Sequence, residues 1–105
     1  MSKYQRQKGA RGEREVASLW KEIGFPFARR KLSQYQEKSG VDLENTEPFI
    51  VQCKVGKSIH LWKALKEIEE NRKKSELPIV MFKRDRDEWI VLMRFSTFKH
   101  ILRPT

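Results

Sequence analysis

The sequence predicts an α/β domain, a mixed five-stranded sheet with helices packed on it, in the order helix, three strands, helix, two strands, helix. Residues 11–23 and 58–74 carry apolar side chains at helical spacing. Short apolar runs bounded by turn residues lie between and after them. With 105 residues the chain is long enough for one modest core, so residues 1–105 are expected to form a single domain.

The first helix is expected to begin near residue 11 and to end at Gly24. Its apolar stripe consists of Val16, Leu19, Trp20 and Ile23. Residues 25–28 predict a short first strand, which Pro26 places at a strand start or a sheet edge. Residues 29–39 are polar and predict a loop.

Residues 41–44 and 49–55 predict two strands joined by a turn around Pro48, and therefore a hairpin. The strand at residues 49–55 is expected to lie at the centre of the sheet. Ser58 is a candidate N-cap for a helix that continues to about Lys74. The apolar stripe of this helix consists of Leu61, Ala64, Leu65 and Ile68.

Residues 77–82 and 89–93 predict a second hairpin. Ser96 is a candidate cap for a terminal helix. The apolar face of that helix consists of Phe98, Ile101 and Leu102. Aromatic residues in these apolar runs, Phe95 among them, are expected in the core.

Three polar residues of the first hairpin suggest a chemical site. Gln52 and Lys54 lie two apart in one strand and therefore project from the same face, and Asp42 opens the preceding strand. If Val51 and Cys53 face the core, the two polar side chains face the other way. Taken singly, the three residues have ordinary explanations as a turn residue and solvated strand positions. Together they bring a carboxylate, an amide oxygen and an ammonium to one point, as a hydrolytic metal site requires.

Glu13 is a candidate fourth member of this site. It lies one turn before Val16, on the shoulder of the apolar stripe, from which it can lean over the sheet. An acidic residue in the first turn of a helix is also favoured by the helix dipole. Helical geometry favours neither interpretation over the other.

The charge balance favours a polyanionic partner. The chain has 23 Lys and Arg against 14 Asp and Glu, a formal net charge of +9. No expected helix has a broad basic face and no stretch approaches membrane-spanning length, so we expect no membrane partner. Cys53 is the only cysteine, which excludes an internal disulfide and a cysteine-rich zinc site. With no signal peptide visible, we expect a cytoplasmic protein.

Two sets of motifs resemble a known family. The sequence KGARGERE at residues 8–15, followed by Gly24 and Phe25, resembles the N-terminal signature of archaeal-type Holliday junction resolvases, which also occur in phages. The sequences VDL at 41–43 and VQCKV at 51–55 are similar to the two strand motifs of the PD-(D/E)XK nuclease superfamily. The resemblance implies a restriction-endonuclease-like core and an Mg²⁺-dependent endonuclease that cuts four-way DNA junctions, with Mn²⁺ as a possible substitute. For a phage protein the location would be the host cytoplasm.

The resemblance also implies a metal-ligand set. Asp42 corresponds to the principal metal ligand of the family, and Glu13 to a helix glutamate near the metal. Gln52 occupies the position of the second acidic ligand, and the main-chain carbonyl of Cys53 is a further ligand. The family usually has Glu at position 52. A neutral amide adds no negative charge, so metal affinity should be lower. Val41 also replaces the proline of the superfamily motif.

Further residues correspond to catalytic and DNA-binding positions. Lys54 matches the motif lysine that activates water and stabilises charge on the phosphate, and Arg29 matches an arginine of the junction-cutting site. Ser33 or Ser39 corresponds to a loop serine. The residues expected to contact DNA are Lys8, Arg11, Arg14, Arg29, Arg30, Lys31, Ser33, Ser39 and Lys57.

The resemblance implies a symmetric homodimer, because a four-way junction presents two equivalent strands, and Trp62 is a candidate for its interface. Three alternatives remain beside the resolvase. The same fold can act on a flap, a mismatch or a restriction-like target. The replacement at Gln52 can instead indicate a catalytically weak DNA-binding module. The third alternative is a basic scaffold or ribosome-associated protein.

Overall fold

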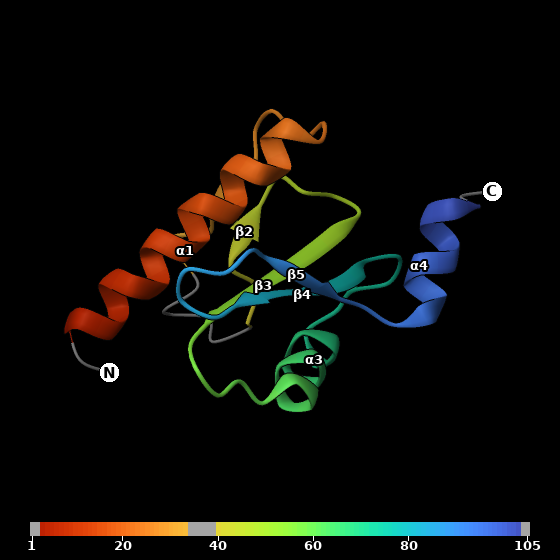
Figure 1. Ribbon diagram of the computed structural model, residues 1–105. Coiled ribbons are helices and arrows are strands. Elements are labelled where there is room, and N and C mark those ends of the chain that lie inside the picture. Colours follow the sequence, from red (N-terminus) through yellow and green to blue (C-terminus); the bar gives the residue numbers. More distant parts are fainter. Residues whose placement is uncertain (1–2, 34–39, 104–105) are drawn as a thin grey trace.

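Helices cover both faces of a small sheet in the computed structural model, which describes residues 3–33 and 40–103, with side chains from Gly9 onward (Figure 1). The helices are α1 (Lys3–Glu22), α3 (Leu61–Glu70) and α4 (Phe95–Leu102). The strands are β1 (Arg29–Arg30), β2 (Leu43–Glu44), β3 (Phe49–Val55), β4 (Leu77–Lys83) and β5 (Ile90–Leu92). The elements follow one another in the expected order and form an α/β fold.

The strands divide between two sheets, so the expectation of one five-stranded sheet is wrong. In the larger sheet β4 is central, parallel to β3 and antiparallel to β5, which confirms the second predicted hairpin. β3, expected at the centre, is an edge of this ladder. β1 and β2 pair only with each other among the described strands. The segment before β2 reaches β3 through one backbone hydrogen bond, from the N–H of Asp42 to the carbonyl of Val51 at 2.8 Å, so the first predicted hairpin does not form a ladder.

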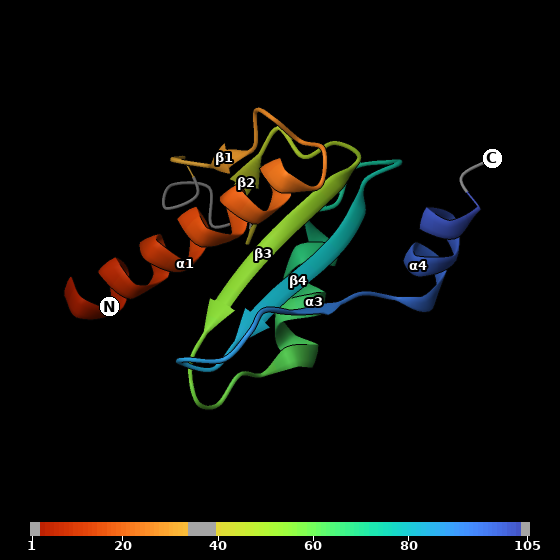
Figure 2. The same cartoon turned by 45° about the horizontal axis from the view of Figure 1, so that its top comes forward.

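Alternating side chains of β3 and β4 enter two separate cores. The cores lie on opposite faces of the larger sheet, one under α1 and one under α3, and Figure 2 shows these two helices on either side of β3 and β4. On the α1 face, Val16 and Trp20 pack with Val51. On the α3 face, the core consists of Ile50, Ala64, Leu65, Ile68 and Val80. Because α3 covers this face, the polar side chain of Gln52 on β3 is buried rather than exposed to water.

Trp20 anchors α1 to the sheet. Its indole N–H donates to the sulfur of Met81 at 3.0 Å, and its ring packs edge-on against Phe25 with centroids 5.0 Å apart. α1 begins at Lys3 rather than near residue 11, and Ile23, expected in the buried stripe, is exposed beyond its end. Residues 25–28 form turns instead of the predicted strand, because the N–H of Ala28 donates back to the carbonyl of Phe25 at 3.1 Å.

The other two helices also differ from expectation at their ends. α3 is shorter than residues 58–74, and its N-cap is His60 rather than Ser58. The N-cap of α4 is Arg94 rather than Ser96, and neither helix has a side-chain hydrogen bond at its cap. Within the described part of the chain, no helix combines the length and apolar character of a membrane-spanning segment.

The apolar face of α4 is exposed. Phe95, expected in the core, is 77% exposed, and Thr97 is the buried residue of this helix. Figure 1 shows α4 beyond the end of β5, at the opposite end of the molecule from the start of α1. The apolar face of α4 therefore does not pack against the sheet of its own chain.

Candidate active site

Asp42 is held against the free edge of β3 by two hydrogen bonds. Its N–H donates to the carbonyl of Val51, and its Oδ2 accepts the N–H of Cys53 at 2.7 Å. These bonds use the β3 backbone groups that point away from β4. The carboxylate lies beside the strand that carries Gln52 and Lys54, as the sequence pattern predicted.

Burial controls the protonation of Asp42. Desolvation raises the pKa of its carboxyl from 3.8 to about 7, against the opposing effect of the hydrogen bond from Cys53. The nearby carboxylate of Glu13 raises this pKa further, whereas the cationic Lys54 and Arg30 lower it. Residues from three segments of the chain therefore act on one carboxyl group.

Glu13 reaches this group from α1. It is 6% exposed, and its Oε1 accepts a hydrogen bond from Nε of Arg30 at 2.9 Å. The preceding Gly12 brings the helix close to the sheet, since a Cβ at this position would lie 2.9 Å from a methyl carbon of Val55. Of the two interpretations left open by the sequence, the structure favours the one in which Glu13 leans over the sheet.

Gln52 is the most enclosed member of the set, with an exposure of 2%. Its Nε2 donates to Oε2 of Glu67 on α3 at 3.1 Å. Its carbonyl oxygen Oε1 is buried and has no hydrogen-bond partner among the described residues. The backbone of Gly40 lies against the same amide, because a Cβ there would stand 2.8 Å from Nε2. A buried acceptor without a partner is unusual in a folded protein.

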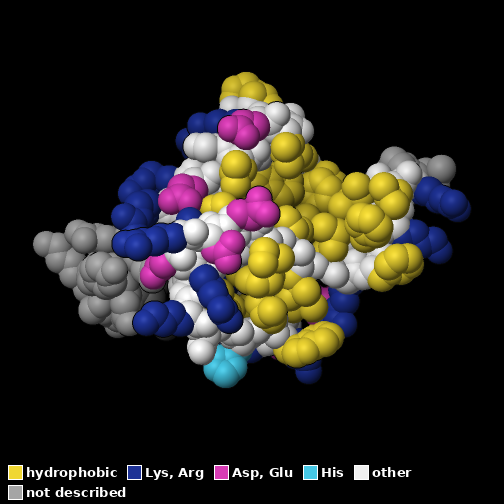
Figure 3. Space-filling model, viewed as in Figure 1, with side chains coloured by type: hydrophobic (Ala, Val, Ile, Leu, Met, Phe, Trp, Pro, Cys, Tyr) yellow, Lys and Arg dark blue, Asp and Glu magenta, His cyan; other side chains and the backbone are white. Residues whose placement is uncertain are grey.

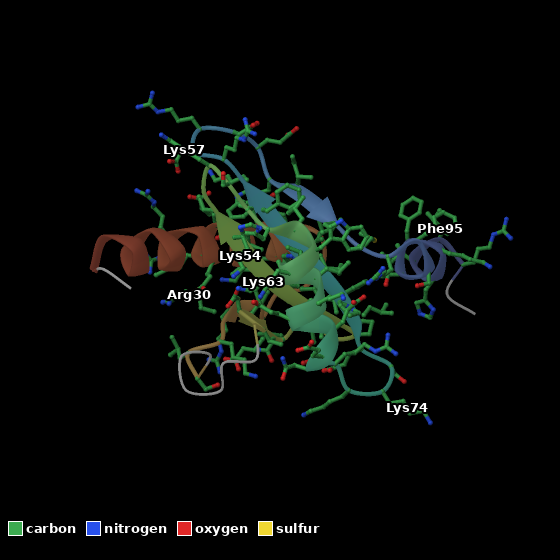
Figure 4. The ribbon with its side chains drawn as sticks, turned by 90° about the horizontal axis from the view of Figure 1, so that it is seen from below. Arg30, Lys54, Lys57, Lys63, Lys74 and Phe95 are labelled. Carbon is green, nitrogen blue, oxygen red and sulfur yellow. The ribbon has the colours of Figure 1, made fainter. Side chains whose placement is uncertain are left out.

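Lys54 faces a cavity of about 250 Å³ between β3 and α3. Lys63 and Glu67 line the same cavity from α3, and Figure 4 shows Lys54 and Lys63 next to each other. Two ammonium groups on one cavity suit an anion such as a phosphate. A larger hollow of about 570 Å³ lies beside residues 24–29 and contains Arg29 but no other predicted catalytic residue.

The donor atoms present fit a hard divalent cation. In residues 3–33 and 40–103, no three His, Cys, Asp or Glu side chains gather as a metal-binding group. The carboxylate of Asp42 and the unpartnered oxygen of Gln52 are nevertheless oxygen donors of the kind that Mg²⁺ and Mn²⁺ bind. The carbonyl of Cys53 lies at the same edge of β3 as the N–H of Cys53, and this N–H donates to the carboxylate of Asp42. Burial raises the pKa of the Cys53 thiol well above its ordinary value, so this residue offers the site its backbone rather than a thiolate.

Arg30, rather than Arg29, reaches the acidic group. Adjacent residues of a strand point to opposite faces, so only one of the two can turn toward Glu13. Arg29 instead pairs with Glu44 on the exposed side of the small sheet. The motif resemblance places Arg29 in the cutting site. In the structure Arg29 pairs with Glu44 instead, and Arg30 is the arginine that contacts Glu13.

The residues expected to contact DNA take several positions. Arg11, Arg14 and Lys57 are exposed, whereas Lys31 and Ser33 are half-buried. Ser39 and the side chain of Lys8 lie outside the described residues. Sequence reasoning missed Lys63 and Glu67, although Glu67 lies beside Ala64 and Ile68 on α3 in the way that Glu13 lies beside Val16 on α1.

Comparisons with protein-family models, with curated proteins and with solved structures found no match to this chain.

Proposed function

We propose that this protein is a metal-dependent, structure-selective DNA endonuclease with a restriction-endonuclease-like core, and that it hydrolyses phosphodiester bonds at four-way junctions. The observation that carries the proposal is the convergence of Glu13 and Lys54 on the carboxyl of Asp42 at one edge of β3. Gln52, on the same strand, has a buried oxygen without a partner among the described residues. The order of the described elements, α1-β1-β2-β3-α3-β4-β5-α4, agrees with such a core. The motif resemblance supplies the reaction class and the junction as substrate.

The metal site of this proposal uses Asp42, Gln52 Oε1 and the Cys53 carbonyl, with Glu13 close by. A bound Mg²⁺ or Mn²⁺ would polarise the scissile phosphate and make a bound water more acidic. Glu13 and Asp42 concentrate negative charge that attracts the cation, and Arg30 holds Glu13 in place. Lys54 places a positive charge where charge develops on the phosphate in the transition state.

The proposed DNA contacts come from exposed basic residues around the site. Arg11 and Arg14 on α1 and Lys57 after β3 are exposed and can bind phosphates. Contacts to phosphate position the DNA without reading its sequence, so binding should weaken steeply as salt increases. This mode of binding agrees with recognition of a branched shape.

A homodimer is part of the same proposal. We call the exposed apolar side chains of α4 the apolar surface, which consists of Phe95, Phe98, Ile101 and Leu102. Trp62 on α3, the predicted interface residue, is also exposed. Figure 3 shows apolar side chains gathered over β5 and toward α4, whereas basic side chains gather toward α1. A surface of this kind suits an isologous contact with a second copy, and two copies supply one active site for each of two equivalent junction strands.

The test is cleavage of a labelled four-way junction in Mg²⁺ or Mn²⁺, with a linear duplex of equal length as a second substrate. The parent should place paired symmetric nicks in the junction. Asp42→Asn and Lys54→Ala should each lower the rate by about 100-fold or more. Glu70→Gln, which alters an exposed acidic residue of α3, and Lys74→Ala, which alters a residue that Figure 4 shows away from Lys54, are the matched controls. Full activity of the first two variants would overturn the site assignment.

A non-cleaving DNA-binding module is the second candidate, and the neutral Gln52 favours it. Junction binding without cleavage by the parent in either metal, and no gain in Gln52→Glu, would support this candidate over the nuclease. Flap and mismatched duplexes in the same assay distinguish another DNA substrate from the four-way junction.

A further inference from the structure

Glu67 lies on α3 and faces β3 at the core on the α3 face of the sheet. Its Oε2 accepts the Nε2 hydrogen bond of Gln52, and its neighbours Ala64 and Ile68 are buried against the sheet. It also lines the 250 Å³ cavity that contains Lys54 and Lys63. An acidic residue that is joined to Gln52 and borders this cavity belongs to the surroundings of the candidate site rather than to the outer surface.

The hydrogen bond determines which way the Gln52 amide is turned. A carboxylate can only accept hydrogen bonds, so it selects the orientation with the amide nitrogen toward α3. The carbonyl oxygen of Gln52 then points away from Glu67, and there it is buried without a partner among the described residues. The backbone of Gly40 closes the nitrogen side of the amide. The carbonyl oxygen of Gln52 therefore has a fixed direction and is enclosed, as is expected for an oxygen that binds a cation.

A single carboxylate at position 52 would provide both an oxygen donor and a negative charge. Here the two are divided between Gln52 and Glu67. Gln52 provides an oxygen donor without charge, and Glu67 provides one negative charge joined to that donor by a hydrogen bond. Groups that hydrogen-bond to a metal ligand orient it and adjust its donor strength. Glu67 therefore brings beside Gln52 the negative charge that position 52 lacks.

We propose that Glu67 is a positioning residue of the cation site: it fixes the carbonyl oxygen of Gln52 for a divalent cation and supplies the negative charge that Gln52 lacks. This inference rests on the proposed metal-dependent function. Glu67 acts through Gln52, so its removal weakens cation binding even when no DNA is present.

The experiment is a calorimetric titration of the DNA-free protein with Mn²⁺. The parent should bind the ion, and Glu67→Gln should bind it about tenfold or more weakly. Glu70→Gln, which removes an exposed acidic residue of the same helix, is the matched control and should bind as the parent does. Circular dichroism and the melting temperature in chelator report whether each variant is folded.

A reciprocal exchange separates this role from a purely structural one. Gln52→Glu/Glu67→Gln retains one carboxylate, one amide and a possible hydrogen bond between them, so it should restore Mn²⁺ affinity to within about threefold of the parent or better. A parent that binds Mn²⁺ while Glu67→Gln binds it equally well overturns this inference and leaves the proposed function standing. A parent that binds no Mn²⁺ overturns both. If Glu67→Gln does not fold, the exchange variant Gln52→Glu/Glu67→Gln is the test. A folded exchange variant that has lost Mn²⁺ affinity overturns the inference.

Discussion

Cys53 donates its backbone N–H to the carboxylate of Asp42 over 2.7 Å, yet Asp42 is a weaker acid than an exposed aspartate. The hydrogen bond stabilises the ionised form, but the loss of water around the carboxylate has the larger, opposite effect. The protein therefore keeps one carboxyl group at this edge of β3 that titrates near neutral pH when no cation is present.

Asp42 should make the free energy of unfolding depend on pH. Its pKa is near 3.8 in the unfolded chain and about 7 in the folded one, so the folded state binds the proton more tightly. Stability should be highest below about pH 4 with respect to this group, fall as the pH rises to about 7, and then level off. The loss is on the order of 4 kcal/mol.

Urea denaturation of Asp42→Asn in chelator checks this expectation. The variant should be more stable than the parent at pH 8, and its advantage should disappear toward pH 4. Asp87→Asn, which alters an exposed turn residue, is the control. An unchanged pH profile in the Asp42 variant would show that this carboxyl does not titrate as described.

Gly40→Ala should destabilise the protein by about 1–3 kcal/mol. Gly40 has a φ of +79°, a conformation that a residue with a Cβ rarely adopts, and the added Cβ would press on the amide of Gln52. Gly56→Ala is the matched control, because nothing lies within 4 Å of the Cβ that it adds. Denaturant midpoints of both variants measure the effect, and a similar small change in both would contradict it.

Arg30→Gln should lower the free energy of unfolding by about 3 kcal/mol. Arg30 pairs with the buried Glu13 and lies near Asp42, so its removal leaves two carboxyl groups with less compensating charge. Arg29→Gln removes an ion pair on the exposed side of the small sheet and should cost at most about 1 kcal/mol. Adding Glu13→Gln to Arg30→Gln should recover part of the loss. Equal losses in the two single variants would count against this account.

Arg94→Ala should loosen α4 selectively. The guanidinium of Arg94 donates to both carboxylate oxygens of Glu69, at 2.7 and 3.0 Å, and lies 5.5 Å from the ring centre of Trp62. These contacts join the start of α4 to α3. Hydrogen exchange should become faster for the amides of α4 and stay unchanged for those of β4. Uniformly faster exchange would instead indicate a global loss of stability.

The proposed homodimer should depend on the apolar surface. Phe95→Glu places a charge in that surface and should raise the dimer dissociation constant by about tenfold or more, as measured by sedimentation. Phe27→Glu is the control, because Phe27 and Phe95 are both 77% exposed and Phe27 lies outside the apolar surface. An unchanged dimer in Phe95→Glu would place the interface elsewhere, and a monomeric parent would refute the homodimer.

Local periodicity in the sequence determined the order of helices and strands and the shared face of Gln52 and Lys54. A strand turns every second residue to the same face, and a helix brings Glu13 beside Val16 whatever the rest of the chain does. These relationships depend on residues a few positions apart. They can be predicted because backbone geometry alone imposes them.

Only the tertiary structure decided how these pieces meet. Strand pairing depends on contacts between distant segments, so the division into two sheets and the central place of β4 could not be predicted from local patterns. The second core is the reason that Gln52 is buried and Glu67 becomes its partner. The position of β1 relative to α1 decides that Arg30, rather than Arg29, reaches Glu13. Each of these results depends on which surfaces lie close enough to exclude water, and no local sequence pattern contains that information.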